Sequence, residues 1–241
     1  MHDQKNFRIQ IIIPIATDAY NEELRDWVAV VCPADLTVDV TNLDQGTQAI
    51  QNRTDLATNA PYVIAKVRAA ERLGYDGVLV SDFDMCGVEP SREQVAIPVV
   101  GGFRAQAFTA MALAQKFSVL TILESVIAMQ TEHFYAFGIL DNFASIRSLG
   151  IPVAELTNRE KVVEAAVKIG IECIDNDGAE ALIFGCTGFI GVAPAVSQRL
   201  CEHYRRYIPV TDPNRIALLY LYALIRNGLR QSGLAYAPAG D

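Results

Sequence analysis

Hydrophobic and polar positions divide the chain into short apolar runs that alternate with longer amphipathic segments. The short runs are rich in β-branched residues and have the length of strands, whereas the longer segments repeat hydrophobic residues at helical spacing. Predicted strands lie in residues 8–15, 36–43, 75–82, 97–102, 116–123, 143–153, 179–185 and 207–212. Predicted helices are residues 21–31, 58–74, 104–115, 125–138, 158–178, 194–204 and 214–229. This alternation predicts an α/β fold in which helices cover both faces of parallel sheets.

The same pattern occurs twice along the chain. In each half a long amphipathic helix ends in glycine, at Gly74 and at Gly178, and is followed by an apolar strand and a loop that contains cysteine. The matching segments are AERLGYDGVLVSDFDMCG and CIDNDGAEALIFGCTGF. We therefore expect an internal duplication that gives two pseudo-symmetric parallel-sheet α/β lobes. The first lobe is predicted at residues 1–115 plus 213–241, and the second at residues 116–212.

Composition excludes several classes of function. The chain is 51% hydrophobic and 20% charged, with a formal net charge of -8 and no cluster of lysine and arginine, so we expect no nucleic-acid partner. The apolar runs are too short to cross a membrane, and the N-terminus lacks the apolar core of a signal peptide. We therefore expect a cytoplasmic protein with reduced cysteines. Without a C-x-x-C pair, and with its three histidines far apart, it is expected to hold no metal.

Two loops that follow predicted strands contain the candidate chemistry, because ligands of parallel α/β sheets bind at the carboxyl ends of the strands. In the second loop, Gly185 and Gly188 let the backbone approach a ligand, and Thr187 adds a hydroxyl group. We expect Cys186 at the start of the next helix, where the helix dipole lowers the pKa of a thiol. A thiol or thiolate there is a competent general acid or base. The alternative is a small buried cysteine after a strand.

In the first loop, Asp82 stands where Cys186 stands after its own strand, and Cys86 follows four residues later. Asp82 or Asp84 could instead cap a turn, and Cys86 could be a packed thiol. Arg104 lies at a helix start, where a cation opposes the helix dipole. A carboxylate ligand or an acid such as Asp82 would explain its presence, and a solvated arginine is the alternative.

The sequence resembles the aspartate/glutamate racemase superfamily, and within it the hydantoin racemase branch. The resemblance covers nearly the whole chain. It rests on blocks in the same order and spacing: IIIPIAT, YDGVLVSDFDMCGVEPSRE, IPVVGGFRAQAF, KFSVLTIL, FASIRSLGIPVAEL and DGAEALIFGCTGF. The IRSLGIPV stretch and the GCxG loop are the more specific matches. The resemblance implies two lobes with the active site in the cleft between them, no cofactor, a small-molecule substrate and a homo-oligomer.

In this family two opposed cysteines flank the α-carbon of the substrate, and one removes the proton that the other returns on the opposite face. Cys186 matches the second cysteine. Asp82 stands where the branch has the first, and Cys86 falls where the branch usually has proline. Ile15 stands where the branch has a substrate-contacting asparagine. Arg104 stands where the branch commonly has an acid, and this positive charge suggests a carboxylate-bearing substrate. We therefore expect Cys186 and Asp82 to be the catalytic pair, with Cys86 in reserve.

The resulting hypothesis is a cofactor-independent racemase or epimerase that acts alpha to a carbonyl group of a hydantoin-like or amino-acid-like substrate. One alternative is a cofactor-free decarboxylase of the arylmalonate decarboxylase type, which keeps only the second cysteine as proton donor. Another is a non-catalytic small-molecule sensor. Predicted substrate-binding residues are Pro14, Ile15, Thr17, Phe83, Arg104, Thr121, Ser125, Gly185, Thr187 and Gly188.

Overall fold

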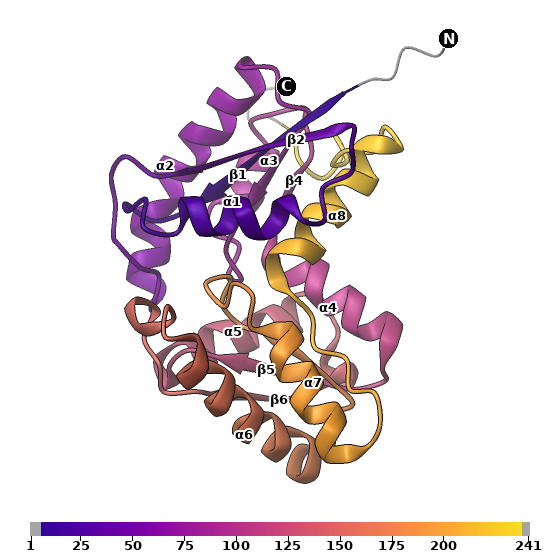
Figure 1. Cartoon of the computed structure of the whole chain (residues 1–241). Coiled ribbons are helices and arrows are strands. Elements are labelled where there is room, and N and C mark those ends of the chain that lie inside the picture. The colour runs from indigo at the N-terminus through magenta and orange to yellow at the C-terminus, as the bar shows by residue number, and fades with distance from the viewer. Residues whose placement is uncertain (1–5, 238–241) are drawn as a thin grey trace. The chain divides into compact units, whose positions relative to one another are not determined.

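The computed structural model describes residues 6–237 and divides the chain into two compact units (Figure 1). Within the described residues, the first unit comprises residues 6–50, 54–102 and 217–237, and the second comprises residues 51–53 and 103–216. Helix α4 (Gly102–Leu113) is grouped with the second unit from Phe103 onward, whereas the sequence placed this segment in the first lobe. Within residues 6–237, no helix has both the length and the hydrophobicity needed to cross a membrane.

The first unit contains a parallel four-stranded sheet with the order β2-β1-β3-β4. Its strands are β1 (Phe7–Ile13), β2 (Leu36–Asn42), β3 (Gly77–Val80) and β4 (Val99–Gly101). The unit's helices are α1 (Asn21–Ala29), α2 (Arg53–Arg72), the short α3 (Val88–Arg92) and most of α8 (Pro213–Arg226). All four residues of β3 are buried, which explains why the strand reads as a continuous apolar run.

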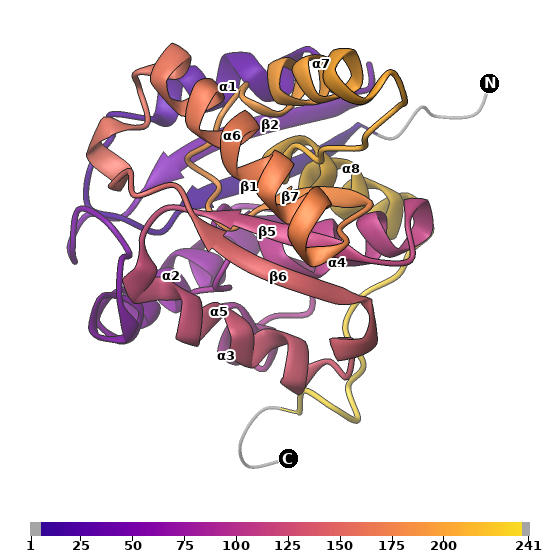
Figure 2. The same cartoon turned by 90° about the horizontal axis from the view of Figure 1, so that it is seen from below.

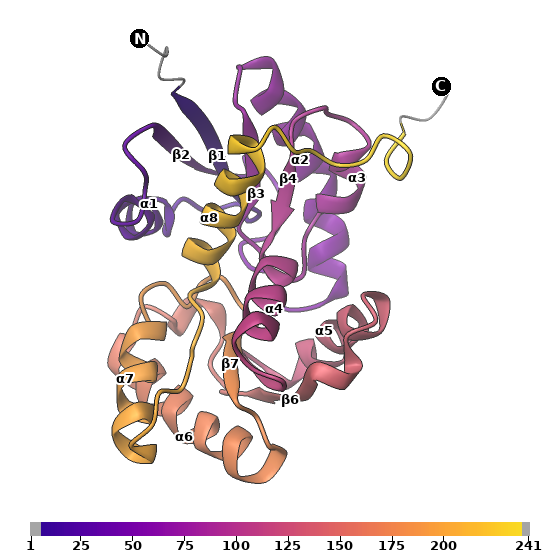
Figure 3. The same ribbon diagram turned by 90° about the vertical axis from the view of Figure 1, so that its right-hand side faces the viewer.

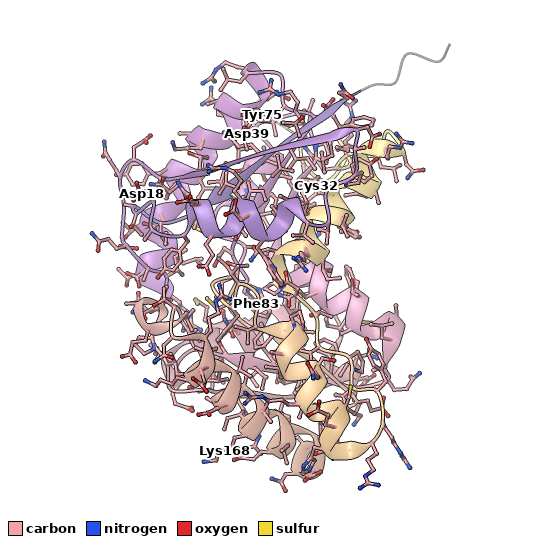
Figure 4. The ribbon with its side chains drawn as sticks, in the orientation of Figure 1. Asp18, Cys32, Asp39, Tyr75, Phe83 and Lys168 are labelled. Carbon is pink, nitrogen blue, oxygen red and sulfur yellow. The ribbon has the colours of Figure 1, made fainter. Side chains whose placement is uncertain are left out.

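Helices cover both faces of this first sheet. The chain moves from β1 outward to β2 and then back past β1 to β3, so right-handed crossovers place α1 and α2 on opposite faces. Figure 3 shows α8 beside α1 and away from α2. Tyr222 of α8 donates a hydrogen bond of 2.6 Å to Asp35. In the middle of β2, Asp39 accepts a hydrogen bond of 2.7 Å from the hydroxyl group of Tyr75 (Figure 4).

The second unit contains a parallel three-stranded sheet with the order β6-β5-β7. Its strands are β5 (Phe117–Thr121), β6 (Phe143–Ser148) and β7 (Ala181–Phe184). Its helices are α4, α5 (Glu124–Ala136), α6 (Arg159–Asp177) and α7 (Ala193–Tyr204), with short 3₁₀ turns at Leu140–Asn142 and Val153–Glu155. Figure 2 shows α5 on one side of this sheet and α6 and α7 on the other.

The two sheets share one topology, as the predicted duplication requires. In each, the first strand lies in the middle, the second pairs on one side and the third pairs on the other, so β2-β1-β3 corresponds to β6-β5-β7. The predicted glycine ends of the long helices are also present, because Gly74 and Gly178 adopt φ angles of 78° and 77°. The prediction of two parallel-sheet α/β lobes is confirmed.

Three details of the sequence prediction were wrong. Residues 207–212 form only an isolated bridge between Val210 and Leu182, because the prolines at 209 and 213 lack the N–H donor that a longer ladder needs. Helix α2 begins at Arg53 rather than at residue 58, with Asp55 in its first turn where a negative charge is favourable. The short helix α3 was not expected.

Candidate functional site

In the first unit, the predicted site residues collect at the carboxyl ends of two adjacent strands. Ile12 of β1 is in register with Val80 of β3, and the N–H of Ser81 donates to the carbonyl of Ile12 over 2.8 Å. The loops that continue from these strands therefore begin side by side. This arrangement brings Pro14 and Asp82 to the same end of the sheet, as the parallel pairing predicted.

Asp82 is a buried carboxyl group, 9% exposed, held by the backbone of its own loop. The N–H of Cys86 donates a hydrogen bond of 2.8 Å to its Oδ2 atom. Burial, together with the nearby Asp84 carboxylate, raises the pKa of Asp82 to about 7, although backbone N–H groups of Cys86, Asp84 and Phe83 act in the opposite direction. Asp82 can therefore both accept and release a proton near neutral pH.

Cys86 lies in a different environment, although it belongs to the same loop. Its side chain is 1% exposed, and its Sγ atom donates to the carbonyl oxygen of Leu56 over 3.4 Å. Burial raises the pKa of the Cys86 thiol far above its ordinary value, and the carboxylates of Asp82 and Asp84 raise it further. The thiol is therefore kept protonated and bonded within the unit.

The backbone of this loop turns sharply to bring these groups together. Met85 adopts a φ angle of 57° and Gly87 one of 66°, both in the left-handed region. A Cβ atom at Gly87 would lie 3.0 Å from the carbonyl oxygen of Ala60, so a side chain has no room there. The turn directs the N–H of Cys86 at Asp82 and leads into α3, where Arg92 Nε donates to the Val99 carbonyl over 3.0 Å.

The other predicted binding residues of the first unit differ in how they are held. The carbonyl of Pro14 accepts a hydrogen bond of 2.8 Å from Nδ2 of the fully buried Asn59. Ile15 is 7% exposed, and Thr17 is partly exposed. Phe83 is fully buried, in the loop after β3 (Figure 4). Pro14 and Phe83 thus have defined packing or bonding roles in the unit.

In the second unit, the Gly185–Gly188 loop also follows directly from a central pairing. Phe184 of β7 is in register with Leu120 of β5, and the N–H of Gly185 donates to the Leu120 carbonyl over 2.8 Å. Cys186 is partly exposed, and its Sγ atom accepts a hydrogen bond from the Gly188 N–H at 3.4 Å. A backbone N–H directed at sulfur stabilises the thiolate form. The loop can therefore support acid/base chemistry at Cys186.

Cys186 does not lie at a helix start, which corrects the sequence prediction. Helix α7 begins at Ala193, and the residues between form turns that include Gly191 at a φ angle of 73°. The prediction assumed that the strand led directly into the helix, but the glycines and Pro194 delay the helix. The hydrogen bond from the Gly188 N–H to Sγ of Cys186 stabilises the thiolate in place of the helix dipole that the sequence predicted.

Close neighbours restrict the space for a side chain at both glycine positions of this loop. A Cβ atom at Gly185 would lie 2.8 Å from Oγ1 of Thr121, and one at Gly188 would lie 2.8 Å from Cδ1 of Leu156. Thr121 is itself fully buried beneath Gly185. These packing constraints explain the glycines without a ligand.

Two further predicted residues border this loop or its strands. Thr187 is 9% exposed, and its carbonyl accepts a hydrogen bond of 2.8 Å from Nδ2 of the buried Asn214. Ser125 is exposed at the start of α5 and donates to the carbonyl of Gln51 over 3.2 Å. Thr187 is thus anchored close to Cys186 in the chain.

Arg104 has an aromatic partner within its own unit. The centre of its guanidinium group lies 4.1 Å from the centroid of the Phe137 ring, a cation–π contact with the end of α5. This contact supplies one reason for a cation at the start of α4.

Sequence reasoning missed two buried glutamines that hold the strand before Cys186. Gln106 of α4 is fully buried and bonds both backbone groups of Phe184, and Gln130 of α5 is 1% exposed and donates to the Gly185 carbonyl. The sequence signal that could have identified them was a lone glutamine inside an apolar helical stretch, because a buried amide is expected to be hydrogen-bonded.

Among residues 6–237, no three acidic, histidine or cysteine side chains cluster as a metal site would require.

The chain matches the model of the Asp/Glu/Hydantoin racemase family over residues 9–221. It is 26% identical to the hydantoin racemase of Rhizobium meliloti, over 93% of this chain and 91% of that protein. The allantoin racemase of Pseudomonas fluorescens has a similar structure, with a TM-score of 0.90 and 25% identity, covering 98% of each chain. Arylmalonate decarboxylase shares the fold, with a TM-score of 0.59 and 18% identity over 92% of this chain and 93% of that one.

Proposed function

Because the chain belongs to the Asp/Glu/hydantoin racemase family, we propose that it is a cofactor-independent racemase or epimerase acting at a carbon alpha to a carbonyl group. In this proposal Asp82 and Cys186 are the two acid/base groups. The relatives named hydantoin racemase and allantoin racemase support a substrate of the hydantoin type, a small ring whose acidic C–H lies next to a carbonyl.

The environment of Asp82 is the observation that carries the proposal. A carboxyl group at its ordinary pKa is a weak base, whereas burial and Asp84 raise the pKa of Asp82 to about 7. General acid/base catalysis is most effective when the pKa of the catalytic group is near the working pH. Asp82 therefore has the proton affinity that this reaction needs, at the position where the related branch has its first cysteine.

The surroundings of Cys86 argue against the same role for the cysteine. A thiol that is 1% exposed, bonded to the Leu56 carbonyl and kept protonated by burial cannot readily remove a proton from carbon. Its backbone N–H instead bonds the carboxylate of Asp82. Cys86 thus supports the orientation of Asp82 through its main chain.

The proposed reaction conserves protons. The Asp82 carboxylate removes the α-proton, the electron pair moves into the adjacent carbonyl as an enolate, and the Cys186 thiol protonates the opposite face. The enzyme is left with protonated Asp82 and a Cys186 thiolate, the form that processes the opposite enantiomer. The Gly188 N–H that points at Sγ stabilises this thiolate.

A neutral ring agrees with the charges of the described residues better than a dicarboxylate does. Asp82 and Asp84, both buried in one loop, would repel the carboxylate groups of a dicarboxylate substrate. The guanidinium group of Arg104 lies against the Phe137 ring of its own unit. The earlier expectation of a carboxylate-bearing substrate thus becomes the less favoured form of the proposal.

The proposal is tested by hydrogen exchange in heavy water. A panel of 5-substituted hydantoins, amino acids and arylmalonates is incubated with the protein, and deuterium at the α-carbon is followed by NMR. We expect both enantiomers of a hydantoin to exchange and to interconvert. Cys186→Ala should abolish this activity, and Ser145→Ala, a change in strand β6, serves as the control.

The alternatives give different results in the same experiment. Release of carbon dioxide from an arylmalonate, with no racemisation, would show a decarboxylase that uses Cys186 alone. Binding of a hydantoin without any exchange, unaffected by Cys186→Ala, would show a sensor. Either result would contradict the racemase proposal.

A further inference from the structure

The strand that leads to Cys186 lacks a full partner along one side. Strand β7 pairs with β5 on one side, as far as Phe184. On the other side, within the described residues, it meets only the bridge between Leu182 and Val210. The N–H of Leu182 donates to the Pro209 carbonyl and the N–H of Thr211 donates to the Leu182 carbonyl, and the ladder ends there. Phe184 therefore has unpaired backbone groups on this side unless a side chain replaces the missing strand.

Gln106 supplies that replacement. Its Nε2 atom donates to the Phe184 carbonyl over 3.0 Å, and its Oε1 atom accepts from the Phe184 N–H over 3.2 Å. One side-chain amide thus forms the pair of hydrogen bonds that a neighbouring strand would form. The Thr211 hydroxyl donates to the same Oε1 atom over 3.1 Å, which fixes the orientation of the amide. Gln106 is fully buried and Thr211 is 5% exposed, so water does not compete for these bonds.

Gln130 holds the next residue. Its Nε2 atom donates to the Gly185 carbonyl over 2.7 Å, and the Gly185 N–H donates to the Leu120 carbonyl over 2.8 Å. The Gly185 carbonyl belongs to the same planar peptide group as the N–H of Cys186. Fixing that carbonyl therefore sets the plane from which the Cys186 side chain projects.

We propose that Gln106 and Gln130 are positioning residues for Cys186, holding its main chain so that the Gly188 N–H remains directed at the Sγ atom. This inference deepens the proposed function, since it concerns the thiol assigned there as an acid/base group. Both glutamines act through the peptide groups of Phe184 and Gly185, to which they are hydrogen-bonded.

The test measures the Cys186 thiol directly and needs no turnover. The rate of alkylation by iodoacetamide is followed at Cys186 by peptide mass spectrometry as a function of pH, in the wild-type chain and in Gln106→Met and Gln130→Met. Methionine keeps nearly the same volume but cannot form the amide hydrogen bonds. Loss of the N–H contact to sulfur should move the midpoint at Cys186 upward by about half a pH unit or more.

Two controls separate positioning from general loosening. The partly exposed Cys201, measured in the same digest, should keep its midpoint, and Ser145→Ala should leave the midpoint at Cys186 unchanged. If both methionine variants leave the Cys186 midpoint at its wild-type value, or move Cys201 by the same amount, the inference is wrong. Where a methionine variant does not fold, Thr211→Val replaces it and should move the midpoint in the same direction; an unchanged midpoint contradicts the inference.

The kinetic readout is separate from the thiol readout. For a hydantoin that the wild-type chain racemises, the glutamine variants should lower kcat about tenfold or more and change KM by less than about twofold, as expected for misplacement of a reacting group. If KM rose by the same factor by which kcat fell, the result would contradict the role of the glutamines as positioning residues. If the wild-type chain shows no proton exchange, the proposed function fails, while the alkylation profile still decides the role of the glutamines.

Discussion

The backbone N–H of Cys86 donates a hydrogen bond of 2.8 Å to Oδ2 of Asp82. This bond distinguishes the roles of Asp82 and Cys86, which were both candidate partners for Cys186. Asp82 is the titrating group, with a pKa raised to about 7, and Cys86 is a buried thiol whose main chain orients the carboxylate. The account of function depends on this division.

The pH dependence of activity should show the titration of the Asp82 carboxyl group. Below a pH of about 7 the carboxyl group is protonated and cannot remove a proton, so kcat/KM should fall as the pH is lowered through that value. An ordinary aspartate would place the same acid limb near pH 4. The profile is measured with a racemised hydantoin, and an acid limb near 4 would show that Asp82 is not perturbed as described.

Removal of the neighbouring charge should move this limb. The Asp84 carboxylate contributes to the raised pKa of Asp82, so Asp84→Asn should shift the acid limb of kcat/KM to lower pH by about half a unit to one unit. Asp44→Asn is the matched control, since the Asp44 side chain is 85% exposed. A limb that stays in place in Asp84→Asn, or moves upward, would exclude this electrostatic coupling.

Asp82 should reduce stability at neutral pH. Its folded-state pKa of about 7 lies above the ordinary value of 3.8, so the folded protein binds a proton there more tightly than the unfolded chain does. Its contribution to stability is therefore lost as the pH rises from about 4 to about 7. Asp82→Asn should raise the free energy of unfolding at pH 8, by at most about 4 kcal/mol, with little change at pH 4.

The stability measurement uses chemical denaturation of both proteins at the two pH values. Asparagine keeps an oxygen that can accept the Cys86 N–H, so the hydrogen bond is retained while the charge is removed. An Asp82→Asn chain less stable than wild type at pH 8 would mean that the carboxylate is favourably solvated. Asp44→Asn should change stability little at either pH.

The loop before Cys186 should not accept a side chain at Gly185. The added Cβ atom of Gly185→Ala would lie 2.6 Å from Oε1 of Gln130 and 2.8 Å from Oγ1 of Thr121. Overpacking of this kind usually costs about 1–3 kcal/mol of stability. Gly233→Ala is the control, because nothing lies within 4 Å of its Cβ position. Equal melting temperatures for the two variants would show that the loop has more room than the structure indicates.

The sequence was sufficient to predict the fold, because the alternation of strands and helices follows from local patterns. Strand runs such as residues 77–80 are continuous apolar segments, and counting from a strand end identified Asp82. The reason for Arg104 was not predictable, since Phe137 is distant along the chain and meets it only in the folded unit. The same holds for Gln106, whose partner Phe184 lies 78 residues away in the chain.

The most direct test compares two single variants in one assay. Racemisation of an active hydantoin is measured for Asp82→Asn and for Cys86→Ala, with folding of each checked by circular dichroism. We predict that Asp82→Asn loses about 10²–10⁴-fold in kcat, the usual contribution of a general base, and that Cys86→Ala stays within a few-fold of wild type. An active Asp82→Asn chain beside an inactive Cys86→Ala chain would contradict the assignment of Asp82 as the partner of Cys186.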